Sequence, residues 1–259
     1  MAELDGAPAG PEQLRRLALS NYGHFTTMTV ADGRVRGLSL HLERLVRDCR
    51  TVFDAALDPD RVRHHLRHAL RERTGPVTAR VTIFDPDLDI GHLTTPARPA
   101  VLVTLRPAGA DGPPLLVRAE PYRRDVPAVK HAGLFGPLLR RRAAQAAGYH
   151  DAIFTTDDGT VLEGATWNAG FVDGERVLWP DGECLPGVTA EILRRAYPGP
   201  IARAPVRLPD LPRMAAAFAT NAVYGVRPIA GIDDVRWPAD HPVLAALRAA
   251  YRNHPAEPI

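Results

Sequence analysis

Apolar residues with helical spacing occur twice in the first third of the chain. From Leu42 to Phe53 they recur every three or four positions, and Ser39 just before them is a residue type that favours a helix N-cap. A second stretch with this spacing follows Pro59 and stops before Gly75, which favours a helix end. These patterns predict two amphipathic helices in succession.

Alternating runs rich in β-branched residues predict strands around those helices. Residues 22–30 and 34–38 flank Asp32-Gly33, a pair typical of a tight hairpin turn. Further strands are predicted at 77–84, 100–105 and 115–119. The first dozen residues, rich in Ala, Gly and Pro, predict a loose segment.

The second half of the chain also mixes helices with hairpins. A helix is predicted from Gly136 to Ala147, because Gly148 is a typical residue just beyond a helix end. Hairpins are predicted over the turns at 157–159 and 173–174. This mixture predicts an α+β fold rather than a doubly wound parallel sheet. Residues 123–127 are the best linker candidate, so we expect two domains, a smaller one at 1–122 and a larger one at 123–259.

Composition and charge argue against several classes of protein. Hydrophobic residues make up 45% of the chain, and the net charge of +2 gives no electrostatic reason to expect nucleic-acid binding. No apolar run approaches the roughly 20 residues of a membrane-spanning helix, and residues 1–11 do not resemble a signal peptide. Two cysteines, Cys49 and Cys184, cannot form a disulfide framework, so we expect a cytoplasmic protein.

Lysine occurs once, at Lys130, although Lys and Arg together number 32. A bias toward Arg explains why lysine is scarce, but it does not explain why one position kept it. Guanidinium replaces ammonium where only charge is needed, yet it does not deprotonate in proteins and cannot attack a carbonyl. The single lysine therefore suggests a covalent role, such as a Schiff base.

Three other features are candidates for binding an anionic, nitrogen-containing ligand. Val188 and Thr189 open a predicted helix, whose free N–H groups can bind a phosphate. Arg80 lies among apolar neighbours in a predicted strand, and Glu163 ends a hairpin strand. Each also has a simpler interpretation: a plain helix cap, an edge-strand arginine facing water, and a solvated glutamate. The His64 and His68 pair has helical spacing for a metal, but no third ligand can be placed, so no metal is expected.

Taken in order, these residues resemble the class IV aminotransferases. This family has pyridoxal-phosphate (PLP) fold type IV and includes branched-chain aminotransferases, D-amino-acid transaminases and aminodeoxychorismate lyases. Lys130 and the later run from Glu163 to Phe171 are similar to the family signature. Similar segments also occur in the family's order at Tyr22–Thr27, His41–Leu45, Leu185–Thr189 and Asn221-Ala222, so that the resemblance covers roughly residues 18 to 235.

The resemblance implies a two-domain α+β enzyme and a set of residue roles. Lys130 would form the Schiff base with PLP and then transfer protons, and Glu163 would pair with the pyridine nitrogen. The residues implied around the phosphate are Arg80, Val188, Thr189, Asn221 and Ala222. The residues implied on the substrate side are Thr26, Thr27, Thr166 and Trp167. An amino donor and an oxo-acid acceptor would be the substrates, and a homodimer is implied.

Three departures from the family pattern leave the substrate open. Phe135 stands where branched-chain enzymes often have a tyrosine, and Asp85-Pro86 follows the Arg80 strand where many members have Arg-Gly. The N-terminal sequence also predicts neither the usual opening strand nor the hairpin. Transamination is the leading expectation, and Asn221-Ala222 keeps pyruvate elimination from an aminodeoxychorismate-like substrate open. A cofactor-free binding protein on the same fold is a third alternative, disfavoured by the presence of Lys130 and Glu163.

Overall fold

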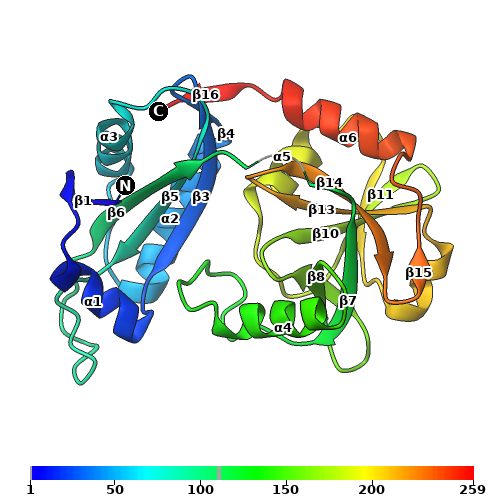
Figure 1. Ribbon diagram of the computed structural model, residues 1–259, viewed down its shortest axis with the longest axis horizontal. Coiled ribbons are helices and arrows are strands. Elements are labelled where there is room, and N and C mark those ends of the chain that lie inside the picture. The colour runs from blue at the N-terminus through cyan, green and yellow to red at the C-terminus, as the bar shows by residue number, and fades with distance from the viewer. Residues whose placement is uncertain (1, 110–111) are drawn as a thin grey trace. The chain divides into compact units, whose positions relative to one another are not determined.

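The computed structural model describes residues 2–109 and 112–259 (Figure 1). The chain forms two compact units. The first comprises Met1–Gly109, Val129–Gly133 and Pro255–Ile259, and the second comprises Ala110–Ala128 and Leu134–His254. This division differs from the expected boundary at residues 122 and 123 for two reasons. Residues 115–121 pair with strands of the second unit, and residues 129–133 return to the first.

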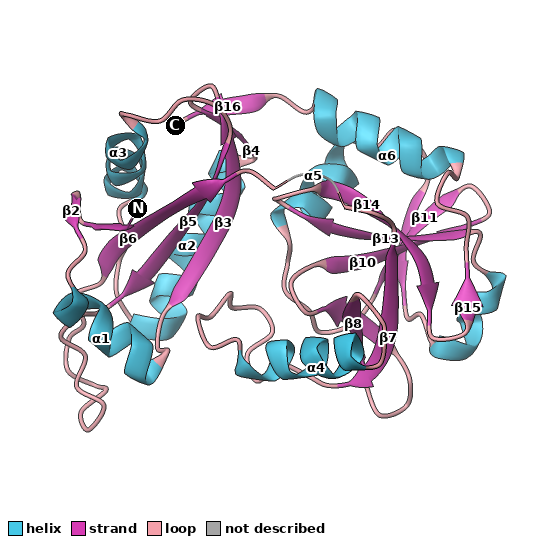
Figure 2. Cartoon of the chain, viewed as in Figure 1, coloured by secondary structure: helices cyan, strands magenta, loops and turns pink. Residues whose placement is uncertain are grey.

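The first unit is built on an antiparallel sheet of seven strands (Figure 2). In spatial order these are β16 (Ala256–Pro258), β4 (Arg34–Arg36), β3 (His24–Ala31), β5 (Val77–Phe84), β6 (Ala100–Pro107), β1 (Ala2–Leu4) and β2 (Ala7–Pro8). The central strands β3, β5 and β6 are the longest, and most of their residues are buried or half-buried. Their predicted positions are confirmed to within two residues at most ends.

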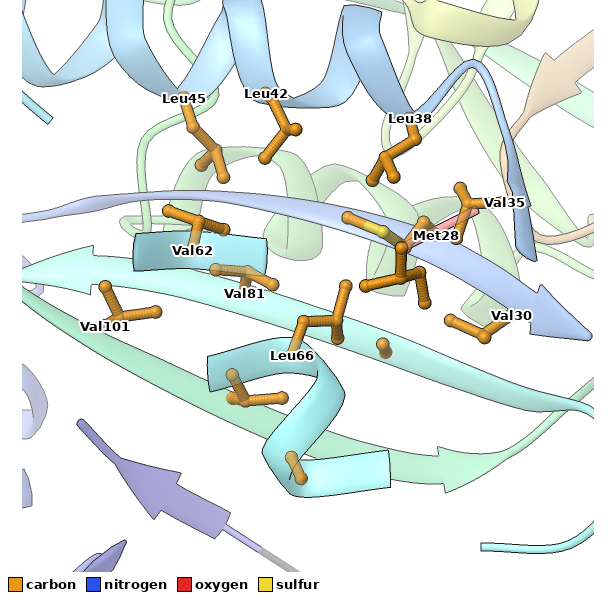
Figure 3. Packing of buried hydrophobic residues seen from close by; sticks show 14 of the residues in the cluster. Met28, Val30, Val35, Leu38, Leu42, Leu45, Val62, Leu66, Val81 and Val101 are labelled. Carbon is orange, nitrogen blue, oxygen red and sulfur yellow. The ribbon is translucent and has the colours of Figure 1, made fainter. Parts of the chain in front are cut away.

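Two helices, α2 (Leu38–Phe53) and α3 (Pro59–Leu70), bury their apolar faces in one core with the alternate residues of β3, β5 and β6. Figure 3 shows Leu38, Leu42 and Leu45 of α2 reaching toward the strands, with Val62 and Leu66 of α3 in the same cluster. Each fully buried aliphatic side chain of this kind contributes about 1.5–3 kcal/mol. The helical spacing in the sequence is thus explained by burial against the sheet.

The N-terminal segment has a regular structure that the sequence analysis did not predict. Strands β1 and β2 form a hairpin over Asp5 and Gly6, both with positive φ, and helix α1 (Pro11–Ser20) follows. The expectation of a loose start without an opening strand or hairpin is therefore wrong. The Asp-Gly pair is itself a hairpin signal, and pairing of β1 with β6 stabilises strands too short to be recognised by alternation.

Helix α2 begins earlier than the sequence pattern indicates. Its N-cap is Gly37, which has a φ of 68°, a conformation that glycine adopts without steric cost. Ser39 lies inside the first turn, where its N–H donates to Glu257 at 3.1 Å and its hydroxyl also contacts that carboxylate. The serine therefore connects α2 to β16 rather than capping the helix.

The second unit contains a mixed sheet of nine strands. Eight follow the order β12 (Ile201–Ala204), β11 (Arg176–Pro180), β10 (Asn168–Asp173), β13 (Ala216–Asn221), β14 (Gly225–Ile232), β7 (Leu115–Pro121), β8 (Asp151–Thr155) and β9 (Val161–Gly164), and β15 (Val235–Arg236) pairs with β14. Three of the pairings are parallel: β11 with β12, β7 with β14 and β7 with β8. The hairpins predicted at 157–159 and 173–174 are confirmed.

Helices of the second unit are α4 (Phe135–Ala146), α5 (Val188–Ala196) and α6 (Pro242–Asn253), with a 3-10 helix at Leu208–Arg213 (Figure 1). Helix α4 ends as predicted ahead of Gly148, whose φ is 87°. Most strand pairings of the unit are antiparallel, and its helices lie between runs of strands, which confirms the α+β fold. Within residues 2–109 and 112–259, no helix has the length and apolar character required to cross a membrane.

Candidate active site

The segment that carries Lys130 is attached to the edge of the first unit's strand β3. Phe25 N–H donates to the Lys130 carbonyl at 2.8 Å, and Ala132 N–H donates to Gly23 at 2.7 Å. His24 and His131 form a bridge between the two segments. The backbone of Lys130 is therefore fixed by pairing as in a sheet, although no strand is predicted there from the sequence.

The ring of Phe25 brings two predicted site residues together in the first unit. The Lys130 ammonium lies 4.7 Å from the centroid of the ring, and the Arg80 guanidinium carbon lies 3.6 Å from it. Arg80 also donates to the Thr82 hydroxyl at 3.2 Å, and burial lowers the pKa of its guanidinium. Thr27 is paired with Arg80 in the sheet register. An amine and a guanidinium thus share one aromatic neighbour.

Thr26 lies on the opposite face of β3, because side chains alternate along a strand. It is fully buried, and its hydroxyl lies 2.6 Å from His41 Nδ1 and also contacts the Arg44 guanidinium. Burial, followed by the charges of Arg44 and Lys130, holds the pKa of His41 well below its usual value. The Thr26 side chain is therefore bonded to residues of helix α2, whereas the Thr27 side chain lies on the same face of the sheet as Arg80.

Helix α2 has a line of buried polar residues, His41, Arg44 and Asp48, which we call the α2 polar stripe. Their spacing of three and four places them along one side of the helix. Asp48 accepts the Lys130 backbone N–H at 3.0 Å and the guanidinium of Arg47 at 2.7 and 3.0 Å. The sequence pattern indicates the apolar face of this helix and the family-like segment His41–Leu45, but it gives no signal for Asp48.

In the second unit, Glu163 ends β9 with 3% of its surface exposed. Its Oε1 accepts from Arg124 Nε at 2.7 Å, and its Oε2 faces the Leu185 N–H at 3.4 Å. Arg124 also donates to the Ala165 carbonyl at 3.0 Å, which fixes the guanidinium on both sides. Burial and then the Glu163 carboxylate raise the pKa of the Cys184 thiol to about 11. The glutamate is thus a buried carboxylate, not a solvated one.

The loop that leads into α5 packs directly against β10. Asn168 donates to the Leu185 carbonyl at 2.7 Å, and a Cβ at Gly187 would lie 1.9 Å from the Asn168 oxygen. Gly187 is the N-cap of α5, so the helix begins at Val188 and Thr189 as predicted. The close approach of the backbone explains why a glycine is needed here.

Two threonine hydroxyls are buried beside this helix start. Thr189 lies in the first turn of α5, and Thr220 is the register partner of Asn168 across β10 and β13. Neither hydroxyl has a hydrogen-bond partner among the residues that the structure describes. A buried hydroxyl without a partner is costly, so both atoms are suited to receive a polar ligand. Thr220 gave no signal in the sequence, where it reads as an ordinary strand residue.

The remaining predicted residues of the second unit surround the same strand end. Thr166 accepts from Arg141 at 2.7 Å, and its carbonyl lies 3.5 Å from the Asn221 amide nitrogen. The Asn221 oxygen accepts the N–H groups of residues 223 and 224, which forms the turn that carries Ala222. Trp167 is buried, and its indole donates to Asp151 at 2.9 Å. Glu163, Thr166, Thr189 and Asn221 are therefore brought into one neighbourhood.

The structure shows the surroundings of Phe135 and Asp85, which both depart from the family pattern. Phe135 opens α4 with 79% of its surface exposed. Asp85 is buried, and its carboxylate accepts the N–H groups of Asp87 and Arg98, both at 2.9 Å. It therefore closes the loop between β5 and β6.

The family described as amino-transferase class IV matches residues 23–232 of this chain. This range includes all the candidate site residues described above. This chain belongs to the class IV aminotransferase family. The resemblance inferred from the order of short motifs is thereby confirmed. No protein of curated function matches the sequence significantly.

Solved structures confirm the predicted fold type IV. A branched-chain aminotransferase from the thermophilic archaeon Thermoproteus uzoniensis, solved with norvaline, has a TM-score of 0.88 at 19% identity, covering 97% of this chain and 93% of that one. A PLP-bound hypothetical aminotransferase from Mycobacterium tuberculosis has a TM-score of 0.81 at 20% identity, covering 97% and 98%. A 4-amino-4-deoxychorismate lyase from Pseudomonas aeruginosa has a TM-score of 0.80 at 26% identity, covering 98% of both chains.

Proposed function

We propose that this class IV aminotransferase family member is a PLP-dependent transaminase that uses Lys130 to hold the cofactor and to transfer protons. The observation that carries the proposal is the placement of the chain's one lysine and of Arg80 on the same ring, Phe25. The lysine supplies the one side-chain amine able to bond a carbonyl, and the arginine supplies a charge suited to a phosphate.

The side chains of both units fit the chemistry of PLP, which acts as an electron sink when it is bound. Glu163 provides a carboxylate for the pyridine nitrogen. Thr189, with the backbone N–H groups at the start of α5, provides donors for the phosphate. The unpartnered hydroxyls of Thr189 and Thr220 favour this assignment, because a phosphate would satisfy them. The full phosphate set that we propose is Arg80, Val188, Thr189, Asn221 and Ala222, with Thr220 added.

Arg124 is proposed as the residue that orients Glu163. The guanidinium binds one carboxylate oxygen at 2.7 Å and is itself fixed by the Ala165 carbonyl. Each carboxylate oxygen can accept more than one hydrogen bond, so the ion pair leaves acceptor capacity for a pyridine N–H. The arginine also compensates the charge of the buried carboxylate.

Lys130 is proposed as the base that takes the proton from the α-carbon of the amino donor. Its backbone is fixed by Phe25 and Asp48, so the amine moves only through its side-chain torsions. We propose Thr27 and Thr166 as side-chain contacts on the substrate side. For Thr26 and Trp167, whose polar atoms are bonded within the protein, we propose a supporting role behind that surface.

A second candidate is elimination of pyruvate from an aminodeoxychorismate-like substrate. Two observations favour it. The Pseudomonas aeruginosa lyase is 26% identical over 98% of the chain, and the turn at Asn221 and Ala222 is ordered by the asparagine side chain. The exposed Phe135 has no hydroxyl with which to contact a cofactor oxygen, which removes a feature of branched-chain enzymes.

We also propose a homodimer in the cytoplasm. Phe135, Leu138 and Leu139 on α4 are 79%, 46% and 43% exposed, at helical spacing that forms one apolar face. A face of this kind favours burial against a second copy. The cytoplasmic location rests on the free thiols of Cys49 and Cys184. Light scattering of the purified protein tests the dimer directly.

A substrate panel distinguishes the two candidate reactions. For transamination, PLP-loaded protein mixed with an amino donor and no acceptor should release about one equivalent of 2-oxo acid per chain, because without an acceptor only the first half of the reaction runs. For elimination, aminodeoxychorismate should instead yield pyruvate and an aromatic amine through many turnovers. Release of neither product from a broad panel would reject both proposals.

A further inference from the structure

The carboxylate of Asp48 is completely buried, yet it belongs to neither the apolar core nor the set of residues around the cofactor. An unpaired carboxylate in this position would cost several kcal/mol. Its Oδ1 accepts two N–H groups of the Arg47 guanidinium, at 3.0 and 2.7 Å. Arg44, also buried, gains a higher pKa from the charge of Asp48, although burial lowers that pKa overall. Two arginines therefore compensate the charge.

The second oxygen of Asp48 makes a different contact. Oδ2 accepts the backbone N–H of Lys130 at 3.0 Å. The carbonyl of the same lysine accepts from Phe25 at 2.8 Å. Both backbone polar groups of Lys130 are thus bonded to elements of the first unit, one to α2 and one to β3. This fixes the position from which the amine extends over the Phe25 ring.

A neutral side chain of similar size could accept the same N–H without the cost of burying a charge. A charge-assisted hydrogen bond is shorter and about twice as strong as a neutral one. The Asp48 carboxylate, compensated by two arginines, therefore strengthens a single hydrogen bond, the one donated by the backbone N–H of Lys130. The α2 polar stripe connects this contact to His41 and Thr26, within the same unit.

We infer that Asp48 is a positioning residue for Lys130, which holds the lysine backbone so that the amine meets the cofactor carbonyl. This rests on the proposed function, because it assigns Lys130 to cofactor capture. Asp48 acts through the backbone of Lys130, and it touches neither substrate nor cofactor in this account. Loss of its charge should leave the lysine in the chain but loosen its position.

The single lysine permits a direct measurement of this contact. Full-length protein freed of PLP and labelled with ¹⁵N-lysine should give one backbone amide cross-peak, that of Lys130. In the wild type we expect a downfield Lys130 amide proton that is protected from hydrogen exchange. Asp48→Asn should shift this proton upfield and reduce its protection, and Asp48→Ala should do so further. An unprotected Lys130 amide in the wild type would overturn the inference without any variant.

Capture of PLP provides the functional measurement. The rate of covalent attachment, followed by absorbance and trapped with borohydride, should fall about tenfold in Asp48→Ala and less in Asp48→Asn. Leu66→Ala is the matched control for lost stability, because it opens the apolar core of the same unit without removing the bond to the Lys130 backbone. Asp173→Asn, which removes a surface carboxylate of the second unit, should leave both measurements unchanged.

The outcomes separate the inference from the function on which it rests. If Leu66→Ala slows capture as much as the Asp48 variants, or if those variants capture PLP at the wild-type rate, Asp48 has only a structural role and the inference is overturned. If the wild type itself attaches no PLP at Lys130, the proposed function fails. The amide signal then still reports whether Asp48 holds the lysine backbone.

Discussion

The two units hold their proposed site residues by different physical means. In the first unit, Lys130 depends on the α2 polar stripe, where the buried Asp48 accepts the Lys130 N–H and the buried Arg44 contacts His41. In the second unit, the loop into α5 depends on close contact between glycines and neighbouring side chains, as at Gly187 and Asn168. The first arrangement should be disturbed by a change of charge, and the second by an increase in side-chain volume. Substitutions and pH should therefore affect the two units unequally.

The largest expected effect concerns volume in the second unit. A Cβ at Gly164 would lie 1.9 Å from the ring of Trp167, which is buried and bonded to Asp151. Gly164→Ala should therefore lower the free energy of unfolding by about 3 kcal/mol, because a packed ring has to move. Denaturant titration followed by tryptophan fluorescence measures this. Gly10→Ala, which meets only an ordinary contact at 3.5 Å, is the control. An equal loss in both variants would contradict the volume argument.

In the second unit, the charges that we place at the cofactor are those of Glu163 and Arg124, and their removal should affect catalysis more than stability. Glu163→Gln should lower kcat about 100-fold while PLP still binds, because an amide cannot hold the pyridine nitrogen protonated. Arg124→Gln should lower kcat less, since the carboxylate remains but loses its orientation. Steady-state kinetics with cofactor titration separates the two effects. Full activity of Glu163→Gln would mean that the ring lies elsewhere.

The first unit should be the pH-sensitive one. Burial, followed by the charges of Arg44 and Arg47, lowers the pKa of His24 from 6.5 to about 3. The unfolded chain therefore binds a proton below pH 6.5 that the folded chain does not. Stability should be lost as the pH falls from about 6.5 toward 3, by about 2 kcal/mol at pH 5 for this residue.

His24→Leu tests that prediction by removing the titrating group from its buried site. Its free energy of unfolding should change less between pH 7.5 and pH 5 than that of the wild type. His92→Gln, at an exposed position of the same unit, should retain the wild-type dependence. A steeper loss of stability in His24→Leu than in the wild type would reverse the sign of the argument.

The smallest expected effect separates ligand binding from folding. The Thr189 hydroxyl is buried without a partner in the described part of the chain. Thr189→Val should thus leave the stability of the PLP-free protein unchanged or slightly higher. It should weaken PLP binding about fivefold, since one neutral hydrogen bond to the phosphate is lost. Calorimetric titration with PLP measures the affinity, and a loss of stability without a change in affinity would assign the hydroxyl a structural role.

The fold could be predicted from the sequence where the hydrophobic pattern of a segment agrees with the residues that mark its ends. Strand β5 was predicted with its true bounds because its eight residues are rich in β-branched side chains, and α4 was predicted because Gly148 marks its end. Short strands such as β1 were missed, since three residues carry no period and depend on pairing with β6. The prediction of Ser39 as an N-cap was wrong because its hydroxyl bonds to Glu257, which is distant in the sequence.

The site was predictable where a residue type is demanded by chemistry, as with Lys130 and Glu163. Residues that act through other residues gave no such signal. Arg124 lies in a segment that resembles a linker, and Asp48 follows Arg47 on a predicted helix, where adjacent charged residues usually face solvent. Their roles depend on contacts between residues 39 positions apart for Arg124 and Glu163, and 82 positions apart for Asp48 and Lys130. Such contacts become visible only in the folded chain.

The most direct test of the account is the location of the covalent bond to PLP. Protein incubated with PLP and reduced with borohydride should carry the cofactor on a single peptide, the one that contains Lys130. Lys130→Arg, which keeps the charge, should abolish both the label and turnover, because guanidinium does not attack the carbonyl. Label found only at the N-terminal amine, or turnover retained in Lys130→Arg, would contradict the central claim.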